Sequence, residues 1–299
     1  MKLARVFFLA VALFGAAAVT AFAQISYTEG GVPVDENVVR TAREIASHST
    51  ETPDWTNPPD FARDVFTFTR IICDRSGRAG VSGGSWITDF PDSDLNLSYR
   101  LQQMTSIKVD PSGRILRLTD RNLFSYPFIY MVEPGALALR DEEVPVLRTY
   151  LLNGGFLFAD DFWGEWQWDN FAEQILRVFP DRRFVDLPMS HPIFHCVFDL
   201  KGPLNRLQTP GERVFLRHEN PEITWETHRQ RDGSTEECRE MHVRAILDDK
   251  GRIMVLATHN CDNGDGWERE GENDKFFRIF SEKRAFPLGI NIIFYAMTH

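Results

Sequence analysis

Acidic side chains and one histidine stand directly after several apolar runs of this sequence. Asp160 and Asp161 follow one run, Glu133 follows another, and His259 follows a third. Carboxyl and imidazole groups act as general acids and bases near neutral pH, and both also bind metal ions. If the loops that carry them meet, these four residues form a candidate catalytic set.

A second group of side chains in the same loops is suited to bind a hydroxyl-rich ligand. Carboxylates and amides hydrogen-bond to hydroxyl groups, and tryptophan offers a flat apolar face. Ordinary structural roles are open as well: Asp160 and Asp161 as helix caps, and Trp163 as a packing residue. The candidate ligand-binding residues are Asp89, Trp163, Asn260, Asp262, Asp265, Trp267 and Glu268.

Several well-known site patterns do not match the sequence. Asp262, Asp265 and Glu268 alternate with glycine, but their spacing is not that of an EF-hand calcium loop. His191 and His195 are four residues apart, but a proline interrupts them and no glutamate follows the first, so a zinc-protease helix is not supported. No phosphate-binding loop of the form Gly-x-x-x-x-Gly-Lys-Ser/Thr is present in the sequence. No cofactor is recognisable, and the identity of any metal stays open.

The apolar runs that carry these residues alternate with amphipathic segments. Residues 156–159 form a short, wholly apolar run of the kind found in buried parallel strands, and residues 141–153 before them have helical spacing. With a strand at 127–132, this is a strand–helix–strand crossover. Further strands are predicted at 65–73 and 115–118, and further helices at 97–105, 170–179 and 288–297. The pattern indicates one α/β domain with a single doubly wound, mostly parallel sheet flanked by helices. Because such sheets bind ligands at the carboxyl ends of their strands, we expect the candidate residues to share one crevice.

The first residues have the features of a signal peptide. Lys2 and Arg5 precede an apolar run at 6–22, and Ala23 followed by Gln24 fits a cleavage site. We therefore expect residues 1–23 to be a signal peptide and the protein to be periplasmic or secreted. A retained anchor is the alternative, and after cleavage no later segment is expected to span a membrane.

Composition separates an arm from the domain that follows it. Residues 24–60 read as an N-terminal arm, with helical spacing at 36–47, and residues 61–299 as the α/β domain. The polar stretch 201–240 reads as an insertion over the sheet edge, and its motion as a lid is left open. The formal net charge of -10 and the lack of a basic cluster argue against nucleic acid as a partner.

A β-hairpin is expected near the C-terminus, at residues 242–258. Gly251 supplies its turn, and pairing of Leu247 with Arg252 would bring Cys238 opposite Cys261. Because an oxidising compartment permits disulfides, we expect a bridge between these two cysteines. The other two cysteines are expected to be free thiols.

Several stretches from about Asp60 to the C-terminus resemble a known bacterial family. They lie at 66–71, 88–97, 126–131, 153–164, 191–193, 259–268 and 289–291. At these residues the chain resembles the family catalogued as domain of unknown function 4159. The resemblance implies a flavodoxin-like fold similar to class I glutamine amidotransferases. Those enzymes place a cysteine after a central strand, whereas the position after Phe158 here carries Asp160 and Asp161, so glutaminase activity is not expected.

Two functional hypotheses follow. In the first, the protein is a non-catalytic ligand- or partner-binding domain of the cell envelope, with envelope proteins or cell-wall saccharides as partners, because no nucleophile or metal set is recognisable. In the second, it is a carboxylate- or metal-dependent hydrolase or lyase acting on a saccharide or another cell-wall component through a crevice lined by Asp160, Asp161, Glu133 and His259. The second requires these groups to converge, with at least one in a water-poor pocket.

Overall fold

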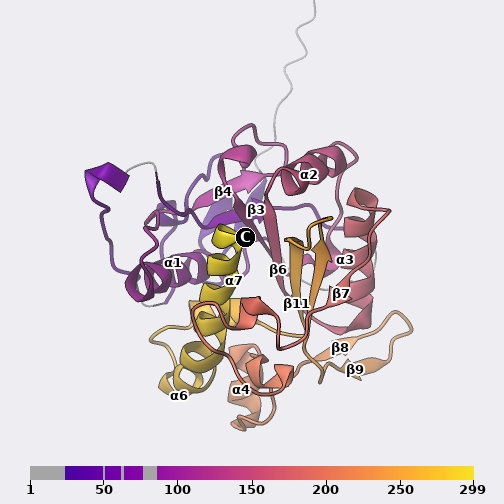
Figure 1. Ribbon diagram of the computed structural model, residues 1–299. Helices are drawn as coiled ribbons and strands as arrows, with labels where there is room; N and C mark the ends of the chain where they lie inside the picture. The colour runs from indigo at the N-terminus through magenta and orange to yellow at the C-terminus, as the bar shows by residue number, and fades with distance from the viewer. Residues whose placement is uncertain (1–23, 50, 62–63, 77–85) are drawn as a thin grey trace, which may run out of the picture.

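A seven-stranded sheet forms the centre of the protein, with strand order β4-β3-β5-β6-β11-β10-β7 (Figure 1). The computed structural model describes residues 24–49, 51–61, 64–76 and 86–299. The predicted signal peptide at 1–23 lies outside the described residues. The strands are β3 (Thr69–Ile72), β4 (Arg114–Arg117), β5 (Phe128–Val132), β6 (Phe156–Phe162), β7 (Val185–Asp186), β10 (His242–Leu247) and β11 (Ile253–His259).

Five neighbouring strands, from β4 to β11 in the sheet order, run parallel. Strand β10 is antiparallel to both of its neighbours, β11 and β7. The prediction of a mostly parallel sheet flanked by helices is confirmed. The parallel strands also bring the loops after β5, β6 and β11 to one edge of the sheet.

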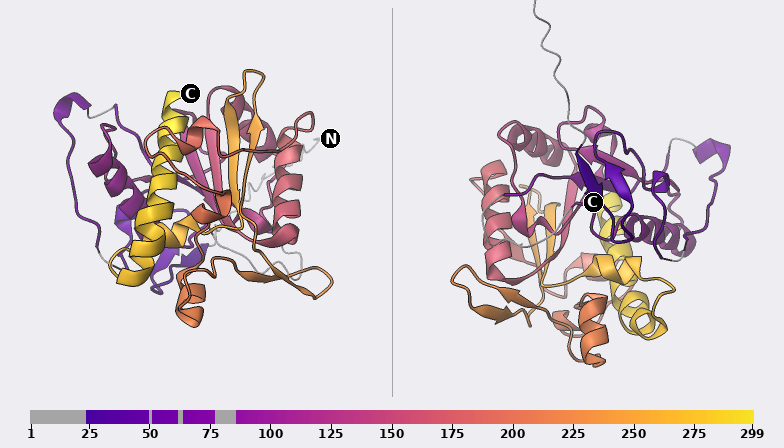
Figure 2. Two further views of the ribbon diagram at one scale, coloured as in Figure 1. Left: turned by 60° about the horizontal axis from the view of Figure 1, so that its bottom comes forward. Right: turned by 180° about the vertical axis from the view of Figure 1, so that it is seen from behind.

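Helices cover both faces of the sheet (Figure 2). Side chains alternate along each strand, so Phe128 and Tyr130 pack in the core under α1 and α7, while Ile129 and Met131 pack in the core under α2 and α3. The helices are α1 (Asp92–Met104), α2 (Glu143–Leu152), α3 (Gly164–Val178), α4 (Glu212–His218), α5 (Asn263–Glu268), α6 (Asp274–Phe276) and α7 (Phe286–Thr298), with a π-helical stretch at Phe277–Ala285. Short 3-10 turns lie at Ala42–Glu44, Pro59–Phe61, Leu123–Ser125, Pro134–Ala136, Pro192–Phe194 and Leu204–Leu207. None of the helices in the described ranges has the length and apolar character needed to cross a membrane.

The N-terminal arm is extended where the sequence predicts a helix. It begins with the paired strands β1 (Ile25–Tyr27) and β2 (Pro33–Asp35), and the predicted helix at 36–47 is wrong, since only the turn Ala42–Glu44 forms there. Backbone bonds hold this segment against the sheet edge: Ala42 N–H donates to the Ser112 carbonyl at 2.9 Å, and Ile115 N–H donates to the Arg40 carbonyl at 2.9 Å. These tertiary bonds replace the local ones that a helix would make.

The predicted disulfide between Cys238 and Cys261 is wrong, because both are buried free thiols. The hairpin pairs His242 with His259 and ends with Leu247 opposite Ile253, so its register differs from the predicted one. Cys261 lies beyond the hairpin, where its backbone forms an isolated antiparallel β-bridge with Phe162 of β6. A shift of the register moves every cross-strand partner, so it separates the two cysteines.

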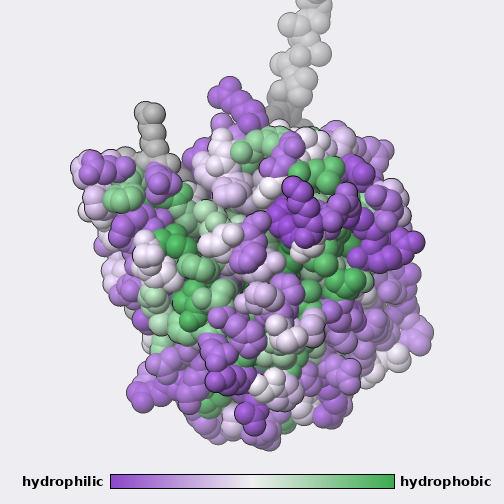
Figure 3. Space-filling model, in the orientation of Figure 1, coloured by the Kyte–Doolittle hydropathy of each residue, from purple (hydrophilic) through white to green (hydrophobic). Residues whose placement is uncertain are grey.

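The insertion at 201–240 contains helix α4 and the antiparallel strands β8 (Thr227–Arg229) and β9 (Thr235–Glu237). These elements lie together at one end of the molecule, at the bottom of Figure 1. The surface around β8 and β9 is mainly hydrophilic (Figure 3). The insertion therefore places polar side chains next to the carboxyl ends of the parallel strands.

Candidate functional site

A cavity of about 520 Å³ lies between the carboxyl ends of the parallel strands and the insertion. This volume falls in the range of small-molecule sites, roughly 300–1,000 Å³. Its walls carry acidic side chains from the arm, from the loops after the strands and from the insertion. These are Glu29, Asp89, Glu133, Asp161, Glu226, Glu237, Asp262 and Asp265.

Three aspartates form the floor of the cavity, and we call them the floor aspartates: Asp89, Asp161 and Asp262. They come from the loop before α1, from β6 and from the loop before α5. One carboxylate oxygen from each lies within 4.8 Å of the others. Their exposed fractions are only 2%, 7% and 5%, so three like charges are brought together away from bulk water.

The backbone at two floor aspartates is left-handed, with φ of 59° at Asp89 and 56° at Asp161. This conformation costs a non-glycine residue about 1–2 kcal/mol. Asp262 is held differently, as the N-cap of α5, where its Oδ1 accepts from the Asp265 N–H at 2.7 Å. A Cβ at Gly264 would come within 2.0 Å of Asp89 Oδ2, so only glycine allows this close approach.

The floor aspartates lack the ion pairs that other buried carboxylates in the described part of the chain have. Among the described residues, no nitrogen of a lysine, arginine or histidine forms an ion pair with them, whereas other buried carboxylates have such partners. The Asp89 Oδ2 atom is buried, and no described residue donates a hydrogen bond to it. An unpartnered polar atom in the interior costs about 1–3 kcal/mol, so its retention needs an explanation.

Burial raises the pKa of each floor aspartate well above its usual range, and neighbouring carboxylates raise it further. Glu268 and Asp265 act on the pKa of Asp89, and Glu133 and Glu226 act on the pKa of Asp161. The pKa of Asp262 is raised first by burial and then by Asp161 and Asp265. The cluster therefore favours uptake of positive charge, either protons or a cation.

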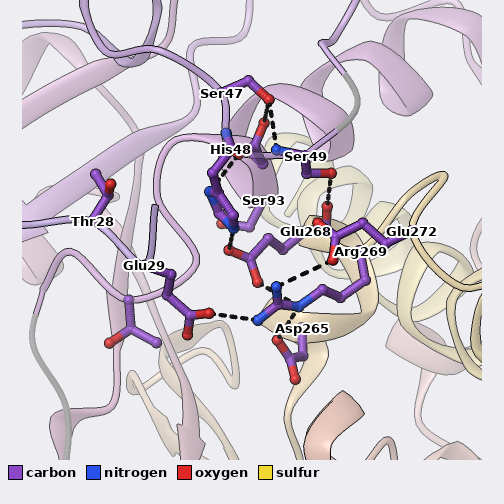
Figure 4. Close-up of polar contacts among 12 residues, drawn as sticks. Thr28, Glu29, Ser47, His48, Ser49, Ser93, Asp265, Glu268, Arg269 and Glu272 are labelled. Carbon is purple, nitrogen blue, oxygen red and sulfur yellow. Dashed lines mark hydrogen bonds and ion pairs between the residues drawn. The ribbon is translucent and has the colours of Figure 1, made fainter. Parts of the chain in front are cut away.

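A second acidic group, Asp265 and Glu268, lies beside the floor and is neutralised by Arg269 (Figure 4). The Arg269 Nε atom lies 3.1 Å from Asp265 Oδ1 and 2.9 Å from Glu268 Oε2, and Nη2 reaches Glu29 at 2.7 Å. Burial raises the pKa of Glu268 to about 8. The Arg269 guanidinium thus occupies the place that a metal ion would take between Asp265 and Glu268.

His48 of the N-terminal arm completes the neutralised group. Its Nε2 lies 2.8 Å from Glu268 Oε1 (Figure 4). Its Nδ1 lies 3.0 Å from Asp92 Oδ2. Hydrogen bonds to Asp92 and Glu268 raise the pKa of His48 to about 10, against the opposing effect of burial. The arm is therefore fastened to α1 and α5 by an imidazolium between two buried carboxylates.

Of the four candidate catalytic residues, Asp161 and Glu133 line the cavity. Glu133 follows β5 with a left-handed backbone, φ 45°, and its Oε2 accepts from Thr88 Oγ1 at 2.7 Å. Asp160 does not line the cavity. It accepts bonds from the side chain and the N–H of Asn263, at 2.8 and 3.1 Å, and from Thr258. Burial raises the pKa of Asp160 to about 6, although these hydrogen bonds act in the opposite direction.

His259 also lies outside the cavity. Its Nε2 is 3.1 Å from the Gly164 carbonyl, its ring packs against Phe162 and Trp168, and Arg244 approaches its Nδ1 at 3.3 Å. Burial lowers its pKa to about 3, so the ring is neutral. The structure therefore does not bring His259 together with the acidic groups.

The candidate ligand-binding residues also divide into those that line the cavity and those that lie outside it. Asp89, Trp163, Asp262 and Asp265 line the cavity, and Glu268 lies behind it in the neutralised group. The other two have structural contacts. The Asn260 side chain bonds the Gly164 N–H and the Glu240 carbonyl, both at 2.8 Å, and the Trp267 indole donates to the Ala285 carbonyl at 2.9 Å in the core.

One wall of the cavity is aromatic. The Trp163 indole N–H donates to Asp161 Oδ1 at 3.0 Å, and its ring stacks on His228 with an interplanar angle of 4°. His228 in turn pairs with Glu226 at 2.9 Å. Half-buried Trp225 lines the same wall. These contacts orient Asp161 towards the open space.

Sequence reasoning missed the cavity residues that come from distant segments. The insertion contributes the wall residues Arg213, Arg217, His218, Trp225, Glu226 and His228, and the arm contributes Glu29. The polar composition of 201–240 was the available signal, but it did not distinguish one side chain from another. The arm residues carried no signal, because their position depends on tertiary contacts.

The chain belongs to the family described as Domain of unknown function (DUF4159), which matches residues 70–297. The matched range includes the floor aspartates, and it excludes the arm with Glu29 and His48. Comparison with curated proteins finds no match. The resemblance to the family that the sequence motifs indicate is confirmed.

Proposed function

We propose that this protein binds a small polar ligand in the acidic cavity, as an exported ligand-binding domain of the cell envelope. The carrying observation is the Asp89 Oδ2 atom, which is buried at the floor of a 520 Å³ cavity without a donor among the described residues. A bound ligand would supply the missing partner and offset the cost of desolvating the carboxylate. The basic and apolar pattern of the first residues supports the exported location.

The chemistry of the walls favours a hydroxyl-rich ligand such as a cell-wall saccharide. Hydroxyl groups donate to carboxylates, and the cavity offers several of them around one space. Trp225 adds an aromatic face, although Arg239 stacks on that ring at 3.9 Å. A protein partner that inserts a polar side chain is the other occupant compatible with these walls.

Thermal unfolding in the presence of cell-wall saccharides, measured both with calcium and with a chelator, tests this proposal. Binding to the folded state stabilises it by about 2.7 kcal/mol at a hundredfold excess over the dissociation constant, so the melting temperature rises. The rise should disappear in Asp161→Asn and persist in Glu282→Gln, which removes an exposed carboxylate outside the cavity. If no saccharide shifts the wild-type protein, the saccharide proposal fails, and pull-downs from the envelope then test for a protein partner.

A second candidate, a saccharide hydrolase or lyase, is favoured by the pair Asp161 and Glu133. Burial first, and then the charge of Glu133, raise the pKa of Asp161, so Asp161 favours its protonated form beside a second carboxyl group. Such a pair can act as general acid and general base. Asp160 and His259 have no part in this candidate, because neither lines the cavity.

Turnover of saccharide substrates separates the two candidates. A hydrolase should lose its activity in both Asp161→Asn and Glu133→Gln, by about 100-fold or more, as expected for removal of an acid or a base. Binding without any turnover in the wild-type protein would leave only the first candidate.

We also infer a relation to the class I glutamine amidotransferase-like, flavodoxin-like fold. Five parallel strands flanked by helices support it, and so do the family motifs. The proposal excludes cysteine-based glutaminase activity, because Asp160 and Asp161 stand where those enzymes carry their nucleophile. An assay for ammonia release from glutamine should therefore be negative.

A further inference from the structure

We propose that Asp89, Asp161 and Asp262 bind a calcium ion at the floor of the acidic cavity. This inference rests on the proposed ligand-binding role of the same cavity, and it names an inorganic ligand there. The three residues lie far apart in the sequence and do not form a calcium-binding loop. Their convergence is produced by the loop before α1, by β6 and by the loop before α5.

The spacing of the three carboxylates suits calcium. Their ligand oxygens all lie within 4.8 Å of one another. Calcium binds oxygen at about 2.4 Å, so ligands on opposite sides of the ion are up to about 4.8 Å apart. Magnesium binds at about 2.1 Å, demands near-ideal octahedral geometry and usually keeps several of its waters, so a site built from three protein carboxylates suits calcium better. One calcium ion can therefore reach an oxygen of each floor aspartate.

The neighbouring acidic group shows why the ion belongs at the floor. Asp265 and Glu268 already have the guanidinium of Arg269 between them, at 3.1 and 2.9 Å. The floor aspartates have no such partner among the described residues, and Asp89, at 2% exposure, keeps one buried oxygen without a donor. Leaving buried carboxylates uncompensated is costly, so the floor is the place where an external cation gains most.

The donor atoms select the type of cation. The floor offers carboxylate oxygens only, which suit calcium, magnesium or manganese better than zinc or copper. The imidazole of His228, on the cavity wall, is already engaged by Glu226 at 2.9 Å and by the ring of Trp163. Since calcium takes 6–8 oxygen ligands, three carboxylates leave positions for water or for the hydroxyl groups of a saccharide in the cavity.

Calorimetric titration of calcium chloride into the chelator-treated, purified protein tests the site. We expect one ion per chain, and at least about tenfold weaker affinity in Asp89→Asn, Asp161→Asn and Asp262→Asn, because each variant removes one ligand charge. Asp262→Asn retains an oxygen that can cap α5, so this variant keeps the fold. The control Glu282→Gln removes an exposed carboxylate outside the cavity, and its calcium affinity should change by less than about twofold.

Terbium luminescence locates the ion independently. Because the Trp163 indole bonds directly to Asp161, terbium at the floor should show tryptophan-sensitised emission. Calcium should displace it, and Trp163→Phe should reduce it. The proposal is overturned if the wild-type protein does not bind calcium at millimolar concentration. It is also overturned if the three variants bind like the wild type, or if bound terbium gives no sensitised emission.

These results are separable from the outcome for the proposed function. Saccharide binding in chelator without any calcium binding would overturn the calcium site and leave the ligand-binding proposal standing. Calcium binding that depends on the floor aspartates, with no saccharide shift in the presence of calcium, would support the ion and overturn the saccharide.

Discussion

Two sets of buried carboxylates in this protein are treated in opposite ways. Asp94 and Asp160 have all the partners they need within the chain: Arg70 binds Asp94 through Nε at 3.0 Å to each oxygen, and Asp160 accepts bonds from Thr258, Asn263 and Gly264. The floor aspartates have no cationic partner among the described residues. The fold can thus give a buried carboxylate an ion pair or a full set of hydrogen bonds when its role is structural. The floor aspartates have neither, since Asp89 Oδ2 has no donor among the described residues, and they mark the place where a ligand is expected.

Breaking the Arg70–Asp94 pair should have the largest effect. Arg70 is fully buried, and it also donates to the carbonyls of Trp86 and Thr88. Arg70→Met would leave Asp94 buried and unpaired, and we expect the free energy of unfolding to fall by about 3–5 kcal/mol, as measured by urea denaturation. The double variant Arg70→Met, Asp94→Leu should recover part of this loss. A loss below about 1 kcal/mol would contradict a structural role for the pair.

The neighbours Asp160 and Asp161 provide a matched test, because the same substitution is made at adjacent positions. Asp160→Asn places an amide N–H group opposite the Asn263 and Gly264 groups that donate to Asp160. We therefore expect the free energy of unfolding to fall by about 2–3 kcal/mol. Asp161→Asn keeps an oxygen for the Trp163 indole and removes a charge from the floor, so no loss is expected. Equal losses in urea denaturation would remove the distinction between the two sets of carboxylates.

Asp89→Asn should stabilise the metal-free protein, and more so at high pH. The pKa of Asp89 is raised, so in the wild type its contribution to stability is most favourable near pH 4 and is lost as the pH rises through the folded-state pKa. The variant has no buried charge to desolvate, so we expect a gain of about 1 kcal/mol at pH 8. Melting curves in chelator at pH 5 and pH 8 measure it. A smaller stabilisation of the variant at pH 8 than at pH 5 would contradict a raised pKa of Asp89.

His48→Gln should show the smallest effect, with its own pH dependence. The raised pKa of His48, about 10, means that its stabilising contribution is fully present below about pH 6.5 and is lost as the pH rises through 10. We expect the wild type to exceed the variant by about 1 kcal/mol or less below pH 6.5, because the imidazole is only partly buried. The difference should shrink towards pH 10, and a constant difference would show that the ion pairs of His48 contribute nothing.

The fold was largely predictable because strands and helices follow local patterns. The apolar run at 156–159 predicts β6, and the helical spacing at 141–153 predicts α2, which spans Glu143–Leu152. The arm was not predictable in this way, because its backbone bonds to Ser112 and Ile115 replace the helix that its spacing favours. The hairpin register was missed by two residues over most of its length, since a β-irregularity near Leu247 is not visible in the sequence.

The candidate site was predictable as a region and not residue by residue. Strand order and direction place Glu133, Asp161 and Asp262 at one edge of the sheet, and the sequence indicates that edge. Whether a side chain at a strand end faces the cavity or the interior depends on the local backbone. The left-handed turn at Asp161 directs it to the cavity, while Asp160 beside it is held inside by α5.

By itself, the sequence determined the family, the parallel α/β sheet and the group of polar loops at its carboxyl edge, because motifs and hydrophobic periodicity are local properties. Only the tertiary structure decided which carboxylates are paired and which are not. Arg70 and His48 neutralise acids that lie far from them in the sequence, and Arg269 binds distant Glu29 as well as its neighbours Asp265 and Glu268. Charge compensation depends on distances of a few ångströms between such elements, and these distances exist only once the chain has folded.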